Sequence, residues 1–255
     1  MLPSLIRKAS CAAALSLVGL LGADASAADL LQKGSHLRIK FDKDIAEEIK
    51  LDGEGVAFPG LVVVLINGDF MGIYIGVDHI SVKGSAHHDT LRVDENLFIR
   101  GNLTVKTGAG DDAVYLSGFF GKNVKVSLGA GRDLLWEGTD PLLIVGSCTI
   151  KAGAGNDVID IRQDIAILGK LSIDLGKGNP AFNTMVGLTE HEVEIGKTLS
   201  VRLSRQGDQD LVLEDVSAPK LVVRGGNGDN HVNLAPGNNV FGDISITKVE
   251  TIDLP

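Results

Sequence analysis

Apolar and polar residues alternate along most of the chain in short runs that return at nearly constant spacing. A side chain on the same face at every second residue is the pattern of a strand with one buried face. In successive units the apolar residues stand three and five positions before a glycine-rich turn: Leu103 and Val105, Val124 and Val126, Cys148 and Ile150, Leu171 and Ile173, Leu221 and Val223. The alternation therefore predicts strands, and no segment predicts a long amphipathic helix.

Each repeating unit contains two further predicted strands. Pairs such as Val114 and Leu116 mark the second strand, after the turn, and pairs such as Leu142 and Ile144 mark the third. The fifth turn residue recurs at intervals of 21 to 29 residues: Asp89, Asp112, Asp133, Asp157, Pro180, Gln209 and Asn230. A constant period signals a solenoid, in which each unit buries its apolar face on its neighbours. We predict an all-β fold, a parallel β-helix (β-solenoid) of about seven coils with a period of about 22 residues.

An antiparallel β-sandwich is the principal structural alternative, because it also has short alternating strands separated by turns. A sandwich does not require identical offsets of the apolar residues in successive units. The repeated offsets therefore favour the β-helix.

The chain divides into three predicted segments. Residues 1–27 have the features of a signal peptide: Arg7 and Lys8, an apolar stretch, and a small-residue cleavage site at residues 25–27. Residues 28–82 depart from the repeat and are predicted to form an N-terminal cap, in which Asn67-Gly68 between two apolar runs indicates a β-hairpin. Residues 83–255 carry the parallel β-helix repeats. The signal predicts a protein that is secreted, or held at the cell surface or in the periplasm.

Composition and charge restrict the partners. The net charge of −9 becomes −9 − 1 = −10 when residues 1–27, with two positive charges and one negative charge, are removed. An acidic chain is a poor partner for nucleic acid, which we do not expect to bind. Cys148 is then the only cysteine, so the exported fold has no intrachain disulfide. We expect a monomer with no transmembrane segment in the mature chain.

The turn itself carries the candidate chemistry. Its best copies read Gly-Ala-Gly-Asp-Asp at residues 108–112, Gly-Ala-Gly-Arg-Asp at 129–133 and Gly-Ala-Gly-Asn-Asp at 153–157. Glycine allows positive φ and keeps the corner free of Cβ atoms. The aspartate then has two possible roles. It can accept hydrogen bonds from backbone N–H groups, or it can join backbone carbonyls in the oxygen-rich shell that Ca²⁺ prefers.

These turns resemble the glycine-aspartate repeats of the RTX, or haemolysin-type calcium-binding, family, whose nonapeptide is Gly-Gly-x-Gly-x-Asp-x-apolar-x. The closest segments are Thr107–Tyr115, Leu128–Trp136, Ala152–Asp160 and Gly225–Asn233. The resemblance implies a β-solenoid with Ca²⁺ as its candidate cofactor. RTX repeats follow one another every nine residues and place metal turns on both sides, whereas this chain has one such turn per coil. The candidate calcium ligands are Asp89, Gly108, Gly110, Asp112, Gly129, Gly131, Asp133, Gly153, Gly155 and Asp157.

Catalytic signals are weak. A β-helix is also the fold of polysaccharide lyases and related hydrolases, which act with acidic and basic side chains between long loops. The nearest cluster of that kind is Asp208, Asp210, Glu214, Arg202 and Arg205, and it reads equally as a solvated face with alternating charges. His87 and His88 replace the glycines of the first turn and could form a surface metal site, although adjacent histidines usually point apart.

We therefore expect an exported structural, adhesive or matrix-type β-solenoid module rather than an enzyme. It would bind calcium along one edge of turns and would meet extracellular glycans or surface components. The alternative is a carbohydrate-active β-helix enzyme.

Overall fold

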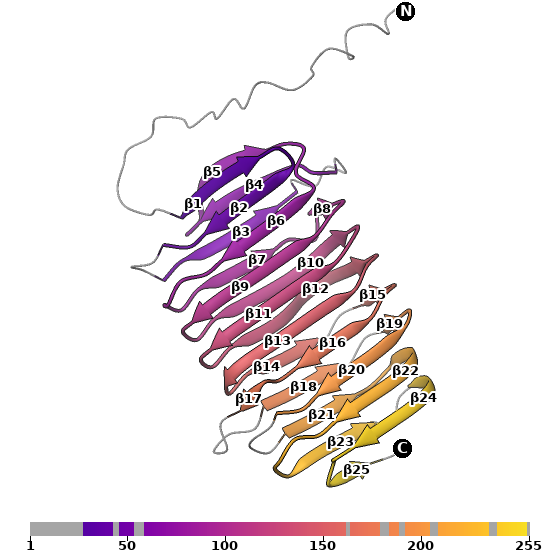
Figure 1. Cartoon of the computed structure of the whole chain (residues 1–255). Coiled ribbons are helices and arrows are strands. Elements are labelled where there is room, and N and C mark those ends of the chain that lie inside the picture. The colour runs from indigo at the N-terminus through magenta and orange to yellow at the C-terminus, as the bar shows by residue number, and fades with distance from the viewer. Residues whose placement is uncertain are drawn as a thin grey trace, which may run out of the picture.

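The computed structural model is an all-β solenoid of about six turns, close to the seven coils predicted (Figure 1). It describes residues 28–42, 46–53, 59–161, 164–178, 184–188, 192–204, 209–234 and 239–253, without the side chains of residues 136–140, 178 and 184–188. No helix occurs in these ranges. The predicted signal peptide at residues 1–27 lies outside them.

Three faces of stacked parallel strands make up the solenoid. Face A contains β2 (His36–Lys40), β6 (His79–Lys83), β9 (Leu103–Ala109), β11 (Val124–Ala130), β13 (Cys148–Gly155), β16 (Leu171–Asp174), β20 (Thr198–Arg202) and the second parts of β22 (Val216–Arg224) and β24 (Val240–Thr247). Face B contains β3 (Glu48–Asp52), β7 (Thr90–Val93), the first parts of β10 (Ala113–Phe120) and β12 (Leu134–Ile144), β14 (Val158–Ile161), β18 (Thr184–Leu188), β21 (Gln209–Leu213), β23 (Asn230–Leu234) and β25 (Thr251–Asp253).

Face C is the narrowest of the three. It contains β8 (Phe98–Ile99), the second parts of β10 and β12, β15 (Ile165–Ile167), β19 (Val193–Ile195) and the first parts of β22 and β24. The short β17 (Lys177–Gly178) adds a rung to the corner between faces A and B. Each chain segment thus passes from face A through face B to face C before it returns one coil further along.

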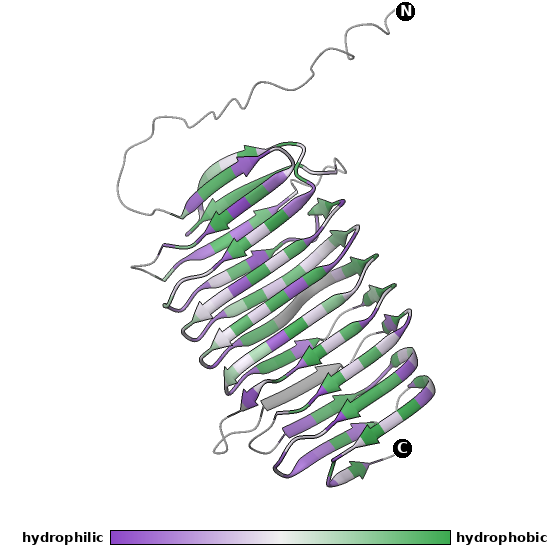
Figure 2. Ribbon diagram, in the orientation of Figure 1, coloured by the Kyte–Doolittle hydropathy of each residue, from purple (hydrophilic) through white to green (hydrophobic). Residues whose placement is uncertain are grey.

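Continuous columns of aliphatic side chains fill the interior. Val105 pairs with Val126, Val126 with Ile150, and Ile150 with Ile173, and each of these side chains is buried. The strands accordingly alternate between apolar and polar residues in Figure 2. The pairing confirms the prediction that equally spaced segments stack in register, because a slip of one residue would turn each apolar column outward.

Antiparallel strands cover the N-terminal end. β1 (Asp29–Lys33) pairs with β2, and β4 (Val62–Ile66) pairs with both β3 and β5 (Asp69–Tyr74). The predicted hairpin is present between β4 and β5, with positive φ at Asn67 (51°) and Gly68 (85°), as a tight two-residue reversal requires.

Parallel stacking begins earlier than the predicted boundary at residue 83. β2 pairs in parallel with β6, and β3 pairs in parallel with β7, so residues 36–40 and 48–52 already belong to the solenoid. The period misses this first coil because the β4–β5 hairpin is inserted between β3 and β6. The cap proper is therefore β1, β4 and β5.

Candidate functional site

The aspartates of the turns form a row along the solenoid, at the corner between faces A and B. The row contains four aspartates, each of which directly precedes a strand of face B and is at most 2% exposed: Asp89, Asp112, Asp133 and Asp157. We call this row the aspartate ladder. The sequence placed these residues in turns, where side chains are usually solvated, so their burial is the first unexpected feature of the site.

Glycine lets neighbouring turns lie directly against one another. Gly129 and Gly131 have φ values of 117° and 147°, which side-chain-bearing residues rarely adopt. A Cβ atom on Gly129 would lie 1.9 Å from the carbonyl oxygen of Gly108, and one on Gly131 would lie 1.9 Å from that of Gly110. The two glycine rows are therefore required by the distance between coils as well as by the corner.

Each aspartate caps the aspartate of the preceding coil. The backbone N–H of Asp89 donates to Oδ1 of Asp112 (2.8 Å), that of Asp112 to Oδ1 of Asp133 (2.9 Å), and that of Asp133 to Oδ1 of Asp157 (3.1 Å). This is the hydrogen-bonding role considered from the sequence, carried out between coils. The ladder thus ties four successive coils together at the corner.

The second carboxylate oxygens are buried without a hydrogen-bond partner. They are Oδ1 of Asp89 and Oδ2 of Asp112, Asp133 and Asp157. Burial raises the pKa of the Asp133 carboxyl to about 7, with further contributions from the neighbouring Asp157 and Asp112. Burial raises the pKa of Asp157 to about 6 and also raises the pKa values of Asp89 and Asp112. Burial therefore makes all four carboxyls weaker acids than an exposed aspartate, and Asp133 and Asp157 are the two whose pKa values approach neutrality.

The unpartnered oxygens bear on the calcium prediction. A Ca²⁺ ion takes six to eight oxygen ligands. Here each aspartate has one oxygen without a hydrogen-bond partner. The turn carbonyls of Ala130 and Ala154 already accept the N–H groups of Gly110 and Gly131, so each has one lone pair fewer for an ion. In the described part of the chain no group of three or more His, Cys, Asp or Glu side chains is arranged to hold a metal ion. One oxygen of each of Asp112, Asp133 and Asp157 therefore completes a hydrogen-bonded corner, the other stays uncommitted, and the calcium role stays a prediction.

Two glutamates lie at the same corner as the aspartate ladder, in other coils, and the sequence analysis did not single them out. Glu47 is 3% exposed, its backbone carbonyl accepts the N–H of Thr90, and burial raises its pKa. Glu250 Oε2 accepts the N–H of Asn230 at 2.7 Å. Glu47 lies 42 residues before Asp89, across the inserted hairpin, and Glu250 follows a turn without the glycine pattern. Register with the next coil was the only signal for either residue.

Other residues considered from the sequence have structural contacts. Nδ1 of His88 accepts the backbone N–H of Asp111 (2.8 Å). Cys148 is buried, as predicted from its inward offset. Tyr115 pairs in register with Trp136, whose side chain is outside the described residues. The guanidinium carbon of Arg92 lies 4.1 Å from the centroid of the Tyr115 ring. Arg205 and Asp208 of the charged cluster are also outside the described residues.

A shallow groove of about 620 Å³ runs along face C. Its floor includes Phe119, Leu142 and Leu143, and the ring of Phe119 stacks on that of Phe98 with centroids 4.2 Å apart. Four carboxylates line it, from Glu95, Asp164, Glu192 and Glu194, and its described lining contains no Lys, Arg or His.

Comparison with family models, with curated proteins and with solved structures gave no match. Among the described residues, no helix is long and apolar enough to cross a membrane.

Proposed function

We propose that this protein is an exported structural or adhesive module, a rod whose regular surface rather than a reactive cleft meets its partners. The supporting observation is the in-register stacking of short coils, in which aliphatic columns make up most of the buried core of the described residues and the aspartate ladder ties the coils together at one corner. Export rests on the signal-like pattern of residues 1–27.

An experiment in two parts tests this function. The full chain, expressed in a bacterial host with its own first 27 residues, is fractionated, and the mature N-terminus is read by mass spectrometry. We expect cleavage near Ala28 and recovery outside the cytoplasm. The purified protein is then incubated with a panel of acidic and neutral polysaccharides, and release of reducing ends or of unsaturated products is followed; we expect none. An uncleaved cytoplasmic chain would refute export, and steady product release would refute a purely structural role.

A carbohydrate-active enzyme is the second candidate. It is favoured by the face C groove, because glycoside hydrolysis uses paired carboxylates and sugar rings stack on apolar floors. Lyases also need basic side chains, which the described lining of this groove lacks. If products are released in the assay above, Glu194→Gln and Glu192→Gln in this groove should abolish their release.

Calcium binding is the second part of the proposal and concerns the aspartate ladder. The unpartnered oxygens of Asp112, Asp133 and Asp157 are the groups that an ion would use. An ion that binds only the folded protein stabilises it, and its melting temperature rises as the ion concentration exceeds the dissociation constant. Melting with excess Ca²⁺ and with EGTA at pH 7.5 should therefore differ by several degrees. Identical curves would leave the ladder as a hydrogen-bonded corner alone.

A further inference from the structure

Positive charge is concentrated on one face of this acidic molecule. We call the outward row of face A that lies nearest the aspartate ladder the cationic row. Its positions, from the N-terminal to the C-terminal end, are Lys40, Lys83, Lys106, Ser127, Lys151, Asp174, Arg202, Arg224 and Thr247. Six of these nine described positions are Lys or Arg, in a chain whose net charge is −9. The charges are thus segregated.

The cationic row places like charges directly opposite one another. Lys40, Lys83 and Lys106 are consecutive partners in register, and so are Arg202 and Arg224. Like charges about 5 Å apart repel by about 1 kcal/mol per pair even in water, and such cross-strand pairs destabilise a sheet. An anion lying along the row would remove this repulsion.

Few carboxylates of the protein itself neutralise the row. Lys40 lies 3.7 Å from Asp29, and Arg202 lies 3.5 Å from Asp174. Lys83, Lys106, Lys151 and Arg224 form no ion pair with another described residue. Four exposed cations along one line are therefore available to a ligand.

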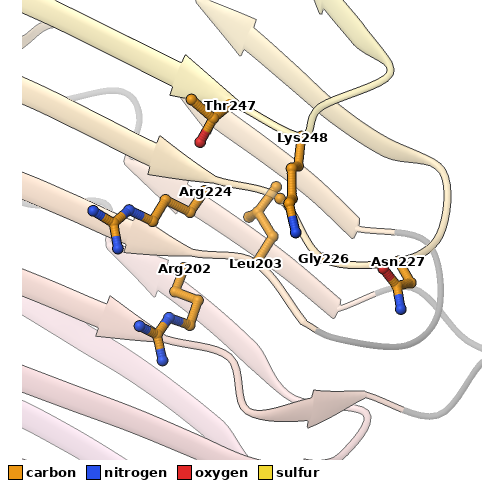
Figure 3. A pocket seen from close by; sticks show the side chains of 8 residues that line it. Arg202, Leu203, Arg224, Gly226, Asn227, Thr247 and Lys248 are labelled. Atoms are coloured by element: carbon orange, nitrogen blue, oxygen red, sulfur yellow. The ribbon is translucent and has the colours of Figure 1, made fainter.

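The row ends in a hollow of about 450 Å³ near the C-terminal end. Figure 3 shows Arg202 and Arg224 extending in the same direction from neighbouring strands, while Lys248 enters from the segment after β24. The backbone of Lys248 has a φ of 55°, and Gly225 lies so close to its carbonyl oxygen that a Cβ atom would be 1.4 Å away. Arg202, Arg224 and Lys248 all line the hollow, and the two guanidinium groups extend together, away from the Lys248 ammonium group.

A second row on the same face carries hydroxyl groups. It runs parallel to the cationic row, two residues earlier in each strand, and includes Ser81, Thr104, Thr149, Ser172, Ser200 and Ser245. The exposed large apolar side chains among the described residues lie on the cap, on faces B and C or at the open C-terminal end. The second row also holds Arg38, Lys125 and the half-buried Val222. Apart from Val222, the outward rows of face A therefore present hydrogen-bonding and charged groups rather than an apolar anchor for a lipid surface.

We propose that face A binds a linear acidic polysaccharide, with its carboxylate or sulfate groups along the cationic row and its hydroxyls beside the Ser/Thr row. Arg202 and Arg224 form its strongest anchor, because they are direct partners in register and guanidinium groups bind carboxylate and sulfate oxygens through paired hydrogen bonds. The cationic row is straight and has one position per coil, so it matches a polysaccharide with regularly spaced anionic groups. The site is separate from the aspartate ladder and does not depend on calcium.

This site is tested by measuring the binding of two polyanions, polygalacturonate and dextran sulfate, by affinity electrophoresis and calorimetry. Neutral dextran is the uncharged control. At least one of the two polyanions should bind, and binding should weaken as salt rises, because ions compete for the charged groups. Arg224→Gln should weaken binding about tenfold, the loss expected for one charge-assisted contact. Arg100→Gln is the matched control, since Arg100 is an exposed arginine outside the two rows of face A and pairs with Asp78.

Unchanged melting curves establish that both variants are folded. Equal losses in the two variants would overturn the site, as would polyanion binding no tighter than that of neutral dextran. Vesicles containing anionic phospholipid separate a membrane from a glycan as the source of the anions. Tighter binding to the vesicles than to either polyanion would overturn the assignment to a polysaccharide. The export experiment measures neither polyanion binding nor vesicle binding. Failure of the polysaccharide site can therefore be distinguished from failure of the proposed function.

Discussion

At the scale of single residues, glycine and aspartate have separate tasks in the turn. Glycine permits positive φ and a spacing between coils that leaves no room for Cβ, and aspartate links the N–H of one coil to the next. The sequence predicted the glycine role, because spacing identifies the corner. It did not predict that the carboxylates would be buried, since a turn motif does not fix the direction in which a side chain points.

Asp133→Asn tests the protonation of the aspartate ladder. Because the pKa of Asp133 is about 7 in the folded protein and near 3.8 in the unfolded chain, the folded state holds the proton more tightly. This contribution to stability is greatest below about pH 4 and is lost as the pH rises to 7. The asparagine retains an acceptor for the Asp112 N–H and has a counterpart in Asn230, whose Nδ2 donates to the Gly228 carbonyl (2.9 Å).

The variant should therefore melt several degrees above the wild type at pH 8 and show a flatter dependence of the melting temperature on pH between 5 and 8. Asp69→Asn is the matched control, because Asp69 is an exposed aspartate at the β4–β5 hairpin, away from the aspartate ladder. A wild-type protein that becomes steadily more stable from pH 5 to pH 8 would contradict the assignment.

At the scale of strands and turns, the inner positions of the coils were predicted correctly. Offsets from the turn identified Val114 and Leu116 in face B and Leu142 and Ile144 in face C, and all four are buried. Side-chain alternation determines these positions because only one register buries the apolar set. The first coil at β2 and β3 was missed, since its two strands are separated from the next coil by a hairpin of different topology.

The two ends of the solenoid differ in how their edges are covered. Antiparallel β1, β4 and β5 cover the first coil. Among the described residues β24 and β25 each pair on one side only, and Ile244 and Ile252 are 54% and 43% exposed. The apolar column therefore reaches solvent at β24 and β25. The predicted repeat region at residues 83–255 includes both strands, but alternation alone does not tell which strand is the last.

At the scale of the whole molecule, stacking in register converts local sequence features into long straight rows. One aspartate per coil becomes the buried ladder, and one lysine or arginine in most coils becomes the cationic row. Neither row is visible as a cluster in the sequence, because its members are more than 20 residues apart. The period predicted the fold, while the charge segregation needed the register.

Distances between pairs of spin labels along the cationic row test this stacking most directly. Labels are attached to pairs of cysteines substituted at two of the positions Lys40, Lys106, Lys151 and Arg224, in a background in which Cys148 is replaced by serine or alanine. Each added coil should lengthen the distance by about 5 Å, whatever the number of residues between the sites. Lys40 and Arg224, seven coils apart in the row, should lie about 34 Å apart, with intermediate pairs in proportion. Distances that do not increase in coil order would contradict the stacked solenoid and both rows that depend on it.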